Sequence, residues 1–487
     1  MATTPQSALF TDFYSITMSQ GYWKKQLDKP AVFEMFFRRQ PYSGGYAVFA
    51  GLETLLTAIS NLQFTPDDIE YLRSLALFDE DFLDYLRGFK FTGSLYAMDE
   101  GRVVFPQEPL IRVEGGLIEC QILEGALLNI INFQTLIATK AARVWLASRK
   151  GAVMEFGLRR AQGPDGALSA ARAAYIGGAS GTSNVLAGKT FGIPVLGTMA
   201  HSWVMAFTSE EEAFQAYADI YPKNPVFLID TYDTLRSGAP NAIKVGKRLA
   251  EKGQNFGVRL DSGDIHYLAE EVRKMLDAAG LPNATISASN DLDESIIQTM
   301  TDGLAPINTW GVGTNMITGA GEAAFAGVYK LIAREDQGRL RSVIKFSDNP
   351  EKTTTPGVKQ VSRIYDTHGM AVADALTLEA TDYPEESPDT IAAGDTITLW
   401  HPSADYRHFV HTIDGTVKPL LTLKMDKGAL TSPNPPLADI RRLVSQDLDT
   451  FDNSYKRILN PHIYKVSVTE QLRELKLRLI KEHLTNL

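Results

Sequence analysis

Residues able to do chemistry follow several short apolar runs between positions 150 and 335. Thr198 and His201 come after the run IPVL, and Arg259 and Asp261 close the run FGVRLD. A histidine with a pKa near about 6.5 can serve as base, acid or nucleophile, and the planar fork of arginine fits phosphate or carboxylate. Aspartate can accept hydrogen bonds from ribose hydroxyls or help to hold Mg²⁺. These residue types indicate an anion-binding site with a reactive histidine; the alternatives are a core histidine and a structural ion pair.

A glycine-rich segment, GVGTN at 311–315, follows another of these runs. Glycines let backbone N–H groups converge on an anion, and a threonine hydroxyl adds a further donor. A tight turn explains the same segment equally well. The run before it, TISA, also ends in polar residues. The candidate anion-binding residues of this region are Gly311, Gly313, Thr314, Ser289 and Asn290.

The segment EFGLRRAQGP at 155–164 places Phe156 close to Arg159, where a strand gives way to a loop. A phenylalanine ring can stack on a planar ligand, and an arginine can pair with an acid on that ligand. Taken alone, the segment is better explained by a core phenylalanine and a surface arginine.

The segment GGASGTSNVLAG at 177–188 is a loop of small residues that runs into a helix. Ser180, Thr182 and Ser183 are candidates for the helix cap, which is the default interpretation. A ligand lying close to the backbone is the alternative, because small residues permit close approach.

The elements that must position these residues alternate regularly. Short apolar runs typical of buried strands are separated by helical segments, of which 265–280 is the clearest. This pattern predicts a parallel sheet covered by helices. A doubly wound sheet would place ligands at one switch point, whereas a barrel spreads polar residues over the ends of many strands. Because nearly every run ends in polar residues, we expect an α/β barrel with its site at the C-terminal ends of the strands.

Composition limits the classes of function. The chain has 487 residues, a net charge of −10 and 44% hydrophobic residues. This acidic balance argues against a sequence-independent nucleic-acid surface. The single cysteine, Cys120, allows no internal disulfide and no cysteine-based metal site. The N-terminus lacks a signal-peptide pattern, and the apolar stretch 122–147 carries polar interruptions typical of a buried helix. We therefore expect a cytoplasmic protein without membrane or nucleic-acid partners.

Several segments in the same order and spacing resemble the nicotinate phosphoribosyltransferase family. They include TDFYSITM near the start and, further along the chain, FEMFFRR, EFGLRRAQGPDGALSA, GGASGTSNVLAG, GTMAHSWV, DTYDTLRSGAPNAI, VRLDSGD, GVGTN and GVYKL. The resemblance covers most of the chain. It implies an enzyme that forms nicotinate mononucleotide and diphosphate from nicotinate and 5-phosphoribosyl 1-diphosphate, coupled to ATP hydrolysis. It also implies an irregular α/β barrel, an additional α/β domain and a homodimer with shared active sites.

The resemblance assigns roles by position. His201 matches the phosphorylated histidine of the family, and Arg259 and Asp261 match residues that hold phosphoribosyl diphosphate with Mg²⁺. Phe156 would stack on the pyridine ring, with Tyr14 of the second subunit on the opposite face; helical spacing alone would make Tyr14 a core residue. The other substrate-binding residues would be Arg159, Ser183 and Thr198 near nicotinate, and Ser289, Asn290, Gly311, Gly313 and Thr314 near the 5-phosphate.

With this resemblance we expect residues 1–125 to form an N-terminal α/β domain joined by roughly 340–425. Residues 126–340 would form the barrel with the active site, and 426–487 a C-terminal helical segment. The cysteine-rich zinc site of some microbial relatives is not expected, because Cys120 is the only cysteine.

Three other functions are alternatives. A nicotinamide phosphoribosyltransferase carries an acid where Ser183 stands, and that acid would repel a carboxylate. A barrel glycosidase would need Asp261 and Asp264 as its carboxylate pair, but adjacent positions at one strand end place them poorly on opposite faces of a sugar. A non-catalytic ligand-binding barrel would lack one of the chemical groups, whereas His201, Arg259 and Asp261 are all present.

Overall fold

The computed structural model describes residues 7–347, 349, 352–379, 388–404 and 406–485. The chain forms two compact units. Unit 1 contains Met1–Leu136 and Ala324–Leu487, and unit 2 contains Ile137–Ala323. The long helix α5 (Leu117–Ala147) begins in unit 1 and ends in unit 2.

Unit 2 is built on a parallel sheet of six strands in the order β7-β6-β11-β10-β9-β8. Neighbours in this sheet are consecutive in the chain, except that the first strand, β6, pairs with the last, β11. Strands β7 and β8 form its two edges. The strands are β6 (Ala152–Glu155), β7 (Gly181–Thr182), β8 (Val226–Leu228), β9 (Gly257–Leu260), β10 (Thr285–Ala288) and β11 (Thr309–Val312).

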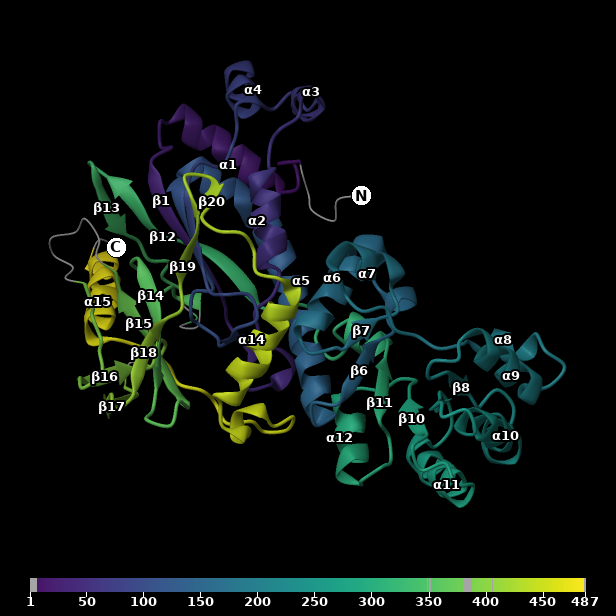
Figure 1. Cartoon of the computed structure of the whole chain (residues 1–487). Coiled ribbons are helices and arrows are strands. Elements are labelled where there is room, and N and C mark those ends of the chain that lie inside the picture. The colour runs from purple at the N-terminus through teal and green to yellow at the C-terminus, as the bar shows by residue number, and fades with distance from the viewer. Residues whose placement is uncertain (1–6, 348, 350–351, 380–387, 405, 486–487) are drawn as a thin grey trace. The chain divides into compact units, whose positions relative to one another are not determined.

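The strands of unit 2 are largely buried, and most of their residues are apolar. Val153, Val258, Ile286 and Val312 have no exposed surface, as expected for parallel strands covered by helices. Figure 1 shows α6 and α7 beside β6 and β7. The helical elements are η2 (Leu158–Arg160), α6 (Gly163–Ile176), α7 (Val185–Phe191), α8 (His201–Met205), α9 (Glu210–Ile220), η3 (Thr234–Gly238), α10 (Ala239–Ala250), α11 (Ile265–Ala278), α12 (Glu294–Asp302) and α13 (Thr314–Ile317).

Helix α11 confirms the amphipathic helix expected at 265–280. It buries Ile265, Val272 and Leu276 on one face. Its N-cap is Asp264, whose Oδ1 accepts a hydrogen bond from the backbone N–H of Tyr267 at 3.1 Å. This cap satisfies one of the free N–H groups of the first turn.

Unit 1 contains two larger sheets. The first has the order β13-β12-β1-β5-β3-β19-β20, with antiparallel neighbours. The second has the order β17-β16-β21-β15-β14-β18 and includes one parallel pair, β15 with β21. A two-stranded ladder joins β2 (Ala47–Val48) to β4 (Val103–Val104). The remaining strands are β1 (Pro30–Phe37), β3 (Ser94–Ala97), β5 (Ile111–Gly116), β12 (Gly327–Asp336), β13 (Arg339–Ser342), β14 (Lys359–Tyr365), β15 (Ala371–Leu378), β16 (Thr396–Trp400), β17 (His408–Thr412), β18 (Thr416–Pro419), β19 (Thr422–Asp426), β20 (Ala429–Leu430) and β21 (Val466–Val468).

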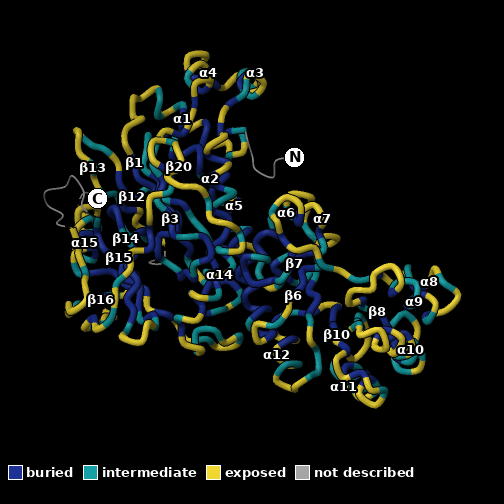
Figure 2. Tube along the Cα trace, viewed as in Figure 1, coloured by how far each residue is buried: buried dark blue, intermediate teal, exposed yellow. Residues whose placement is uncertain are grey.

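The helical elements of unit 1 include α5, which is long and apolar enough to cross a membrane by length and composition. Two thirds of its most apolar window (67%) is buried inside the protein, so it is typical of a core helix. Figure 2 shows the buried strands β14 and β15 of the same unit. The other helical elements are α1 (Phe13–Lys24), η1 (Pro41–Ser43), α2 (Leu52–Ser60), α3 (Pro66–Ser74), α4 (Glu80–Arg87), α14 (Leu437–Asp449), η5 (Asn453–Lys456) and α15 (Glu470–Thr485).

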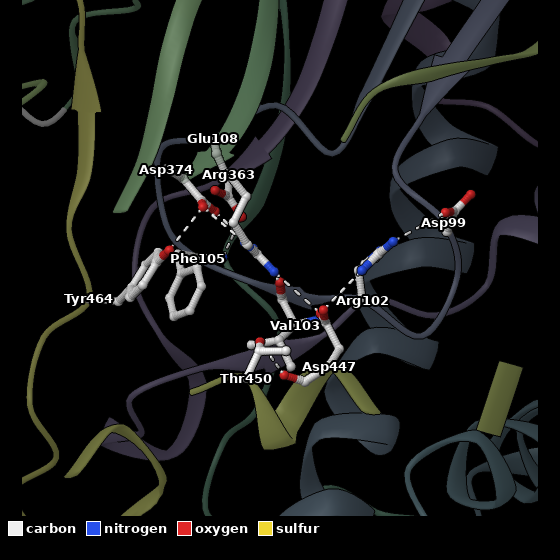
Figure 3. Close-up of polar contacts among 10 residues, drawn as sticks. All are labelled: Asp99, Arg102, Val103, Phe105, Glu108, Arg363, Asp374, Asp447, Thr450 and Tyr464. Atoms are coloured by element: carbon white, nitrogen blue, oxygen red, sulfur yellow. Dashed lines mark hydrogen bonds and ion pairs between the residues drawn. The ribbon is translucent and has the colours of Figure 1, made fainter. Parts of the chain in front are cut away.

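A buried ion network joins distant segments of unit 1 (Figure 3). Arg363 on β14 donates two hydrogen bonds to Asp374 on β15, at 2.9 and 2.8 Å, and a third to Asp447 on α14 at 3.3 Å. Asp447 also accepts from the backbone N–H of Val103 at 2.8 Å. The side chains of Arg363 and of both aspartates are almost completely buried. Removing one partner of such a group leaves an uncompensated charge and costs about 3–5 kcal/mol.

Glu108 lies beside this network with both carboxyl oxygens shielded from solvent (Figure 3). Its Oε1 accepts from the backbone N–H of Phe105 at 2.7 Å. Burial raises the pKa of Glu108 well above its ordinary value, and the negative charge of Asp374 raises it further. Glu108 is therefore protonated more readily than an ordinary glutamate.

Candidate active site

Arg259, on β9, is the centre of a polar cluster in unit 2. Its Nε donates to the Ser289 hydroxyl, its Nη1 to the Thr198 hydroxyl and its Nη2 to the Asp261 carboxylate, each at 2.8 Å. Ser289 also donates to the same oxygen of Asp261. A guanidinium carries five N–H donors, so two of them have no hydrogen-bond partner among the described residues. The cluster thus combines a positioned cation, a carboxylate and two hydroxyls.

These residues come together because the strands are parallel. Ser289 directly follows β10, and Asp261 directly follows β9. Parallel neighbours end at the same edge of a sheet. The structure therefore brings the polar ends of the two runs to one place, where the sequence analysis expected the site.

His201 lies at the start of α8 and adjoins the cluster. Its Nε2 is 3.7 Å from Oδ2 of Asp261, and its Nδ1 is 3.2 Å from the hydroxyl of Thr231. Its side chain is 41% exposed, which leaves the ring accessible to a ligand. The other oxygen of Asp261 is held by Arg259 and Ser289, so Asp261 links the histidine to the arginine.

Asp261 is ionised in this setting. Partial burial opposes its ionisation, but the hydrogen bond from Ser289 and the charge of Arg259 outweigh that effect and lower the pKa of the carboxyl. The backbone N–H of Asp261 donates to Oδ2 of Asp230 at 3.0 Å, and the Ser262 hydroxyl donates to the same oxygen at 2.6 Å. Oδ1 of Asp230 is buried with no hydrogen-bond partner among the described residues.

Phe156 lies next to Arg259, with the guanidinium carbon 5.5 Å from the ring centroid. The ring rests against Gly311 on β11: a Cβ built at Gly311 would be 2.7 Å from two ring carbons and 3.2 Å from the Cβ of Ser289. The glycine is buried inside the strand and not in a turn. Its absence of a side chain therefore makes room for the phenylalanine ring, a reason that differs from the anion nest suggested by the sequence.

Gly313 and Thr314 lie where β11 passes into the short helix α13. A Cβ at Gly313 would be 3.2 Å from the backbone oxygen of Phe156, so this turn is closely packed. Asn290 follows Ser289 with φ of 80°, a left-handed conformation that asparagine tolerates better than most residues. Asn315 steadies that loop by donating to the backbone oxygen of Asp291 at 3.0 Å.

Ser183 lies between β7 and α7, and its backbone N–H donates to the backbone oxygen of Glu155 at 2.9 Å. The N-cap of α7 is Asn184, whose side chain accepts from the N–H of Ala187 at 3.1 Å. The expected caps Ser180, Thr182 and Ser183 are therefore wrong. The Thr182 hydroxyl is already engaged, because it donates to the buried carboxylate of Glu155 at 2.5 Å.

Arg159 and Tyr14 are placed outside the hydrogen-bonded cluster. Arg159 lies exposed on η2, three residues after Phe156. Tyr14 lies on α1 in unit 1 with 45% of its surface exposed, so the alternative of core packing is wrong. Partial burial together with the charge of Glu124 and a hydrogen bond to it raises the pKa of the Tyr14 hydroxyl to about 12.

Asp264 and Asp233, which both follow strands, have structural roles. Asp264 caps α11, as described above, and Asp233 accepts from the N–H groups of Leu235 and Arg236 at the start of η3. Asp264 is therefore engaged as a helix cap, and the pair Asp261–Asp264 required for a glycosidase receives no support.

Two members of the cluster received no role from the sequence. Asp230 ends the run VFLID, and this place after a strand marks it as a candidate for chemistry. Thr231 carried no signal, because an isolated threonine after a strand is common and its contact with His201 depends on the folded loop. The full cluster is suited to hold a phosphorylated sugar beside a reactive histidine and an aromatic ring.

Comparisons with known proteins agree along the whole chain. Residues 9–132 match the nicotinate phosphoribosyltransferase (NAPRTase) N-terminal domain, 152–369 the NAPRTase family, and 358–476 the C-terminal domain. A nicotinate phosphoribosyltransferase of Bacillus subtilis is 46% identical over 483 residues, which cover 98% of this chain and 95% of the relative. The human nicotinate phosphoribosyltransferase is 34% identical over 526 residues, covering 96% and 95% of the two chains.

The structural comparison leads to the same family. The crystal structure of human nicotinic acid phosphoribosyltransferase superposes with a TM-score of 0.81 and 31% sequence identity. The match covers 96% of this chain and 99% of the human one. Sequence and fold thus point to one group of proteins.

Proposed function

The chain belongs to the nicotinate phosphoribosyltransferase family, and from this premise we propose how its residues divide the work of the reaction. It is an enzyme with the activity of that family: it joins nicotinate to the phosphoribosyl group of 5-phosphoribosyl 1-diphosphate and releases diphosphate, a step of NAD biosynthesis. The single observation that carries the proposed roles is the Arg259 cluster, which holds Asp261, Ser289 and Thr198 next to His201.

We propose that Arg259 and Asp261 hold the phosphoribosyl diphosphate. The two free donors of Arg259 would bind a phosphate oxygen, and Asp261 would accept hydrogen bonds from the ribose hydroxyls. Ser289, Asn290, Gly311, Gly313 and Thr314 would surround the 5-phosphate. The support is that these residues follow neighbouring parallel strands, and that a sugar held in place lowers the entropic part of the barrier.

Nicotinate would bind against Phe156. The ring lies close to Arg259 and is fixed by its packing on Gly311, so it offers a rigid face for stacking on the pyridine. The exposed Arg159 would pair with the carboxylate of nicotinate or with a nearby phosphate, and Thr198 would lie beside the ring. Ser183, which is neutral, would accept the carboxylate where an acid would repel it.

We propose that ATP drives the reaction through His201. One ring nitrogen would attack the γ-phosphorus of ATP, the bond to the β-phosphate oxygen would break, and ADP would leave, giving a phosphohistidine. Later attack of water on that phosphorus would release inorganic phosphate and restore the imidazole. Thr231 and Asp261, which flank the two ring nitrogens, would hold the ring in orientation.

Mg²⁺ fits the oxygen atoms of this cluster. Mg²⁺ is usually held by one or two carboxylates together with substrate phosphates, and Asp230 and Asp261 supply carboxylates here. The buried, unpartnered Oδ1 of Asp230 is the observation that favours such a ligand. When bound, the metal would neutralise charge on the diphosphate leaving group. No group of three or more metal-ligating side chains occurs among the described residues, so no protein-only metal site is proposed.

We also propose an irregular α/β barrel and a homodimer. The barrel is supported by the cyclic strand order of unit 2, in which the first and last strands pair. The dimer is supported by the exposed aromatic face of α1, where Phe13 is 54% and Tyr14 45% exposed. Tyr14 of a second copy would cover the pyridine face opposite Phe156. We also propose a cytoplasmic location, with which the single cysteine, Cys120, is compatible.

The test is turnover by the purified chain. Nicotinate or nicotinamide is supplied with 5-phosphoribosyl 1-diphosphate, Mg²⁺ and ATP, and the mononucleotide product is quantified. We expect nicotinate to be used with a kcat/KM at least about 100-fold above that of nicotinamide, because a missing charge partner costs several kcal/mol. Preference for nicotinamide would make the runner-up function correct, and absence of any turnover would favour a non-catalytic binding protein.

A further inference from the structure

A cavity of about 780 Å³ is lined by residues of unit 1. It is lined by residues of the β16–β17 hairpin, of the segment 457–467 and of the ends of β1 and β4. Its cationic lining residues are Arg38, Arg407, Arg457 and Lys465, together with His401, His408 and His462. No described residue of its lining is a carboxylate. This basic cleft stands out in a chain of net charge −10, because it concentrates positive potential against the overall charge.

The basic cleft is preformed by hydrogen bonds of the backbone. The N–H of His401 donates to the carbonyl of Arg407 at 2.9 Å and closes the hairpin end. The carbonyl of Lys465 accepts from the N–H of Asp374 at 2.9 Å, and the N–H of His462 donates to Ser454 at 2.9 Å. A site fixed in this way loses little conformational entropy when a ligand binds.

The four strong cations of the basic cleft lack carboxylate partners among the described residues. Arg38 has a buried Nε with no hydrogen-bond acceptor in the described part of the chain. The Nζ of Lys465 lies 4.6 Å from the ring centroid of Phe409, and no ion pair joins it to a described carboxylate. By contrast, Arg363 in the same unit pairs with two aspartates. Like charges left facing one space repel each other, which an anionic ligand would relieve.

The cations of the basic cleft also affect the protonation of a histidine in its lining. Burial lowers the pKa of His401, and the positive charge of Arg407 lowers it further. The cations thus create a positive potential at His401.

We propose that the basic cleft binds a polyphosphorylated small molecule. Arginine forks and a lysine ammonium are the groups that proteins use for phosphate, and the volume suits a ligand of nucleotide size. Several cations without carboxylates favour more than one phosphate group. The cleft residues all belong to unit 1, whereas the Arg259 cluster belongs to unit 2. The proposal goes beyond the proposed function and does not rest on it.

The experiment measures binding of two probes, inorganic tripolyphosphate and ATP, to the full chain by isothermal titration calorimetry. We expect two binding events per chain in the wild type. A triple substitution in the basic cleft should weaken one event by at least about 100-fold, because each lost charged contact costs roughly tenfold or more. A triple substitution of exposed lysines elsewhere changes the net charge equally and should leave both events intact. The variants are Arg407→Ser with Arg457→Ser and Lys465→Ser, and, as control, Lys247→Ser with Lys252→Ser and Lys481→Ser.

Arg259→Ala separates this site from the active site. We expect it to weaken the other binding event and to leave the basic cleft unaffected. Loss of the same event in both variants would overturn the proposal, since the cleft would then be part of the substrate site. Unchanged binding in the cleft variant would also overturn it, as would a change in oligomeric state on light scattering, which would make the cleft a subunit contact. Tighter binding of ATP than of tripolyphosphate would add a nucleoside to the ligand; equal binding would leave the phosphates as the whole recognised group.

Discussion

Replacing Gly311 with alanine would place a methyl group 2.7 Å from two carbons of the Phe156 ring. Carbon atoms in ordinary contact lie about 3.5–4.0 Å apart, so the ring has to retreat by about 1 Å. It cannot do so by moving the backbone freely, because the N–H of Phe156 is bonded to the carbonyl of Val312 at 2.9 Å. The ring must therefore rotate away from the position in which it is proposed to stack on nicotinate.

We expect Gly311→Ala to lower kcat/KM for nicotinate by about 100-fold, the usual cost of a misplacement of 1 Å in an active site. The free energy of unfolding should fall by about 1–3 kcal/mol, as for other overpacked sites. The assay is steady-state formation of nicotinate mononucleotide with nicotinate varied and the other substrates saturating, alongside urea unfolding at the same temperature.

Gly197→Ala is the matched control. An added Cβ there meets no atom within 4 Å, and the residue is not in a left-handed conformation. It should change neither kcat/KM nor stability. In a Phe156→Leu background the methyl at 311 should cost less than tenfold, since the smaller side chain leaves room. A Gly311→Ala enzyme with unchanged kinetics for nicotinate would refute the argument that this glycine positions the ring.

Three further results are expected. Asp264→Ala should lower the free energy of unfolding by about 1 kcal/mol through the lost α11 cap and keep most of the activity. Asp261→Ala should lower kcat/KM by at least about 100-fold, because the cluster loses its carboxylate. Equal losses of activity in the two variants would contradict this division of roles. Burial raises the pKa of Glu108 in the folded state. Its contribution to the free energy of unfolding is therefore complete below about pH 4.3 and is lost as pH rises toward the folded pKa, at about 1.4 kcal/mol per pH unit. Glu108→Gln should flatten this fall in urea unfolding at pH 5, 6 and 7, and an unaltered pH slope would contradict a raised pKa of Glu108. Ser183→Asp should raise KM for nicotinate at least about tenfold through charge repulsion and raise the relative use of nicotinamide, and an unchanged substrate ratio would place Ser183 away from the carboxylate.

The sequence predicted the arrangement of the site because one simple rule governs it. Parallel strands end at one edge, so polar residues after successive apolar runs are expected to meet. Arg259, Asp261 and Ser289 do so. To apply this rule, it is enough to know that apolar runs alternate with helical segments and that βαβ connections are right-handed.

What the sequence could not supply were contacts that depend on the folded loops. The hydrogen bond between His201 and Thr231 joins residues that are 30 positions apart in the sequence. No local sequence pattern marks the threonine. The packing of Phe156 on Gly311 was hidden for the same reason, so the glycine was taken as part of an anion nest. The cap of α7 was misassigned because four closely spaced residues, at 180, 182, 183 and 184, are all good caps. In the folded chain Thr182 is engaged with Glu155, and Asn184 supplies the cap.

The buried network of Arg363 shows a different limit. Its partners Asp374 and Asp447 come from distant parts of the chain, and charged residues are normally placed at the surface. Only the packing of β14, β15 and α14 brings them together. The basic cleft of unit 1 arises similarly, since its cations are scattered from Arg38 to Lys465 in the sequence.

The central claim is that His201 accepts a phosphoryl group from ATP beside the Arg259 cluster. The most direct measurement is formation of nicotinate mononucleotide by wild type and His201→Ala, each with and without ATP, at fixed nicotinate, 5-phosphoribosyl 1-diphosphate and Mg²⁺. The account predicts that ATP stimulates the wild type and has no effect on the variant. Equal product formation by both proteins, with no response of either to ATP, would contradict it and leave His201 as a structural residue.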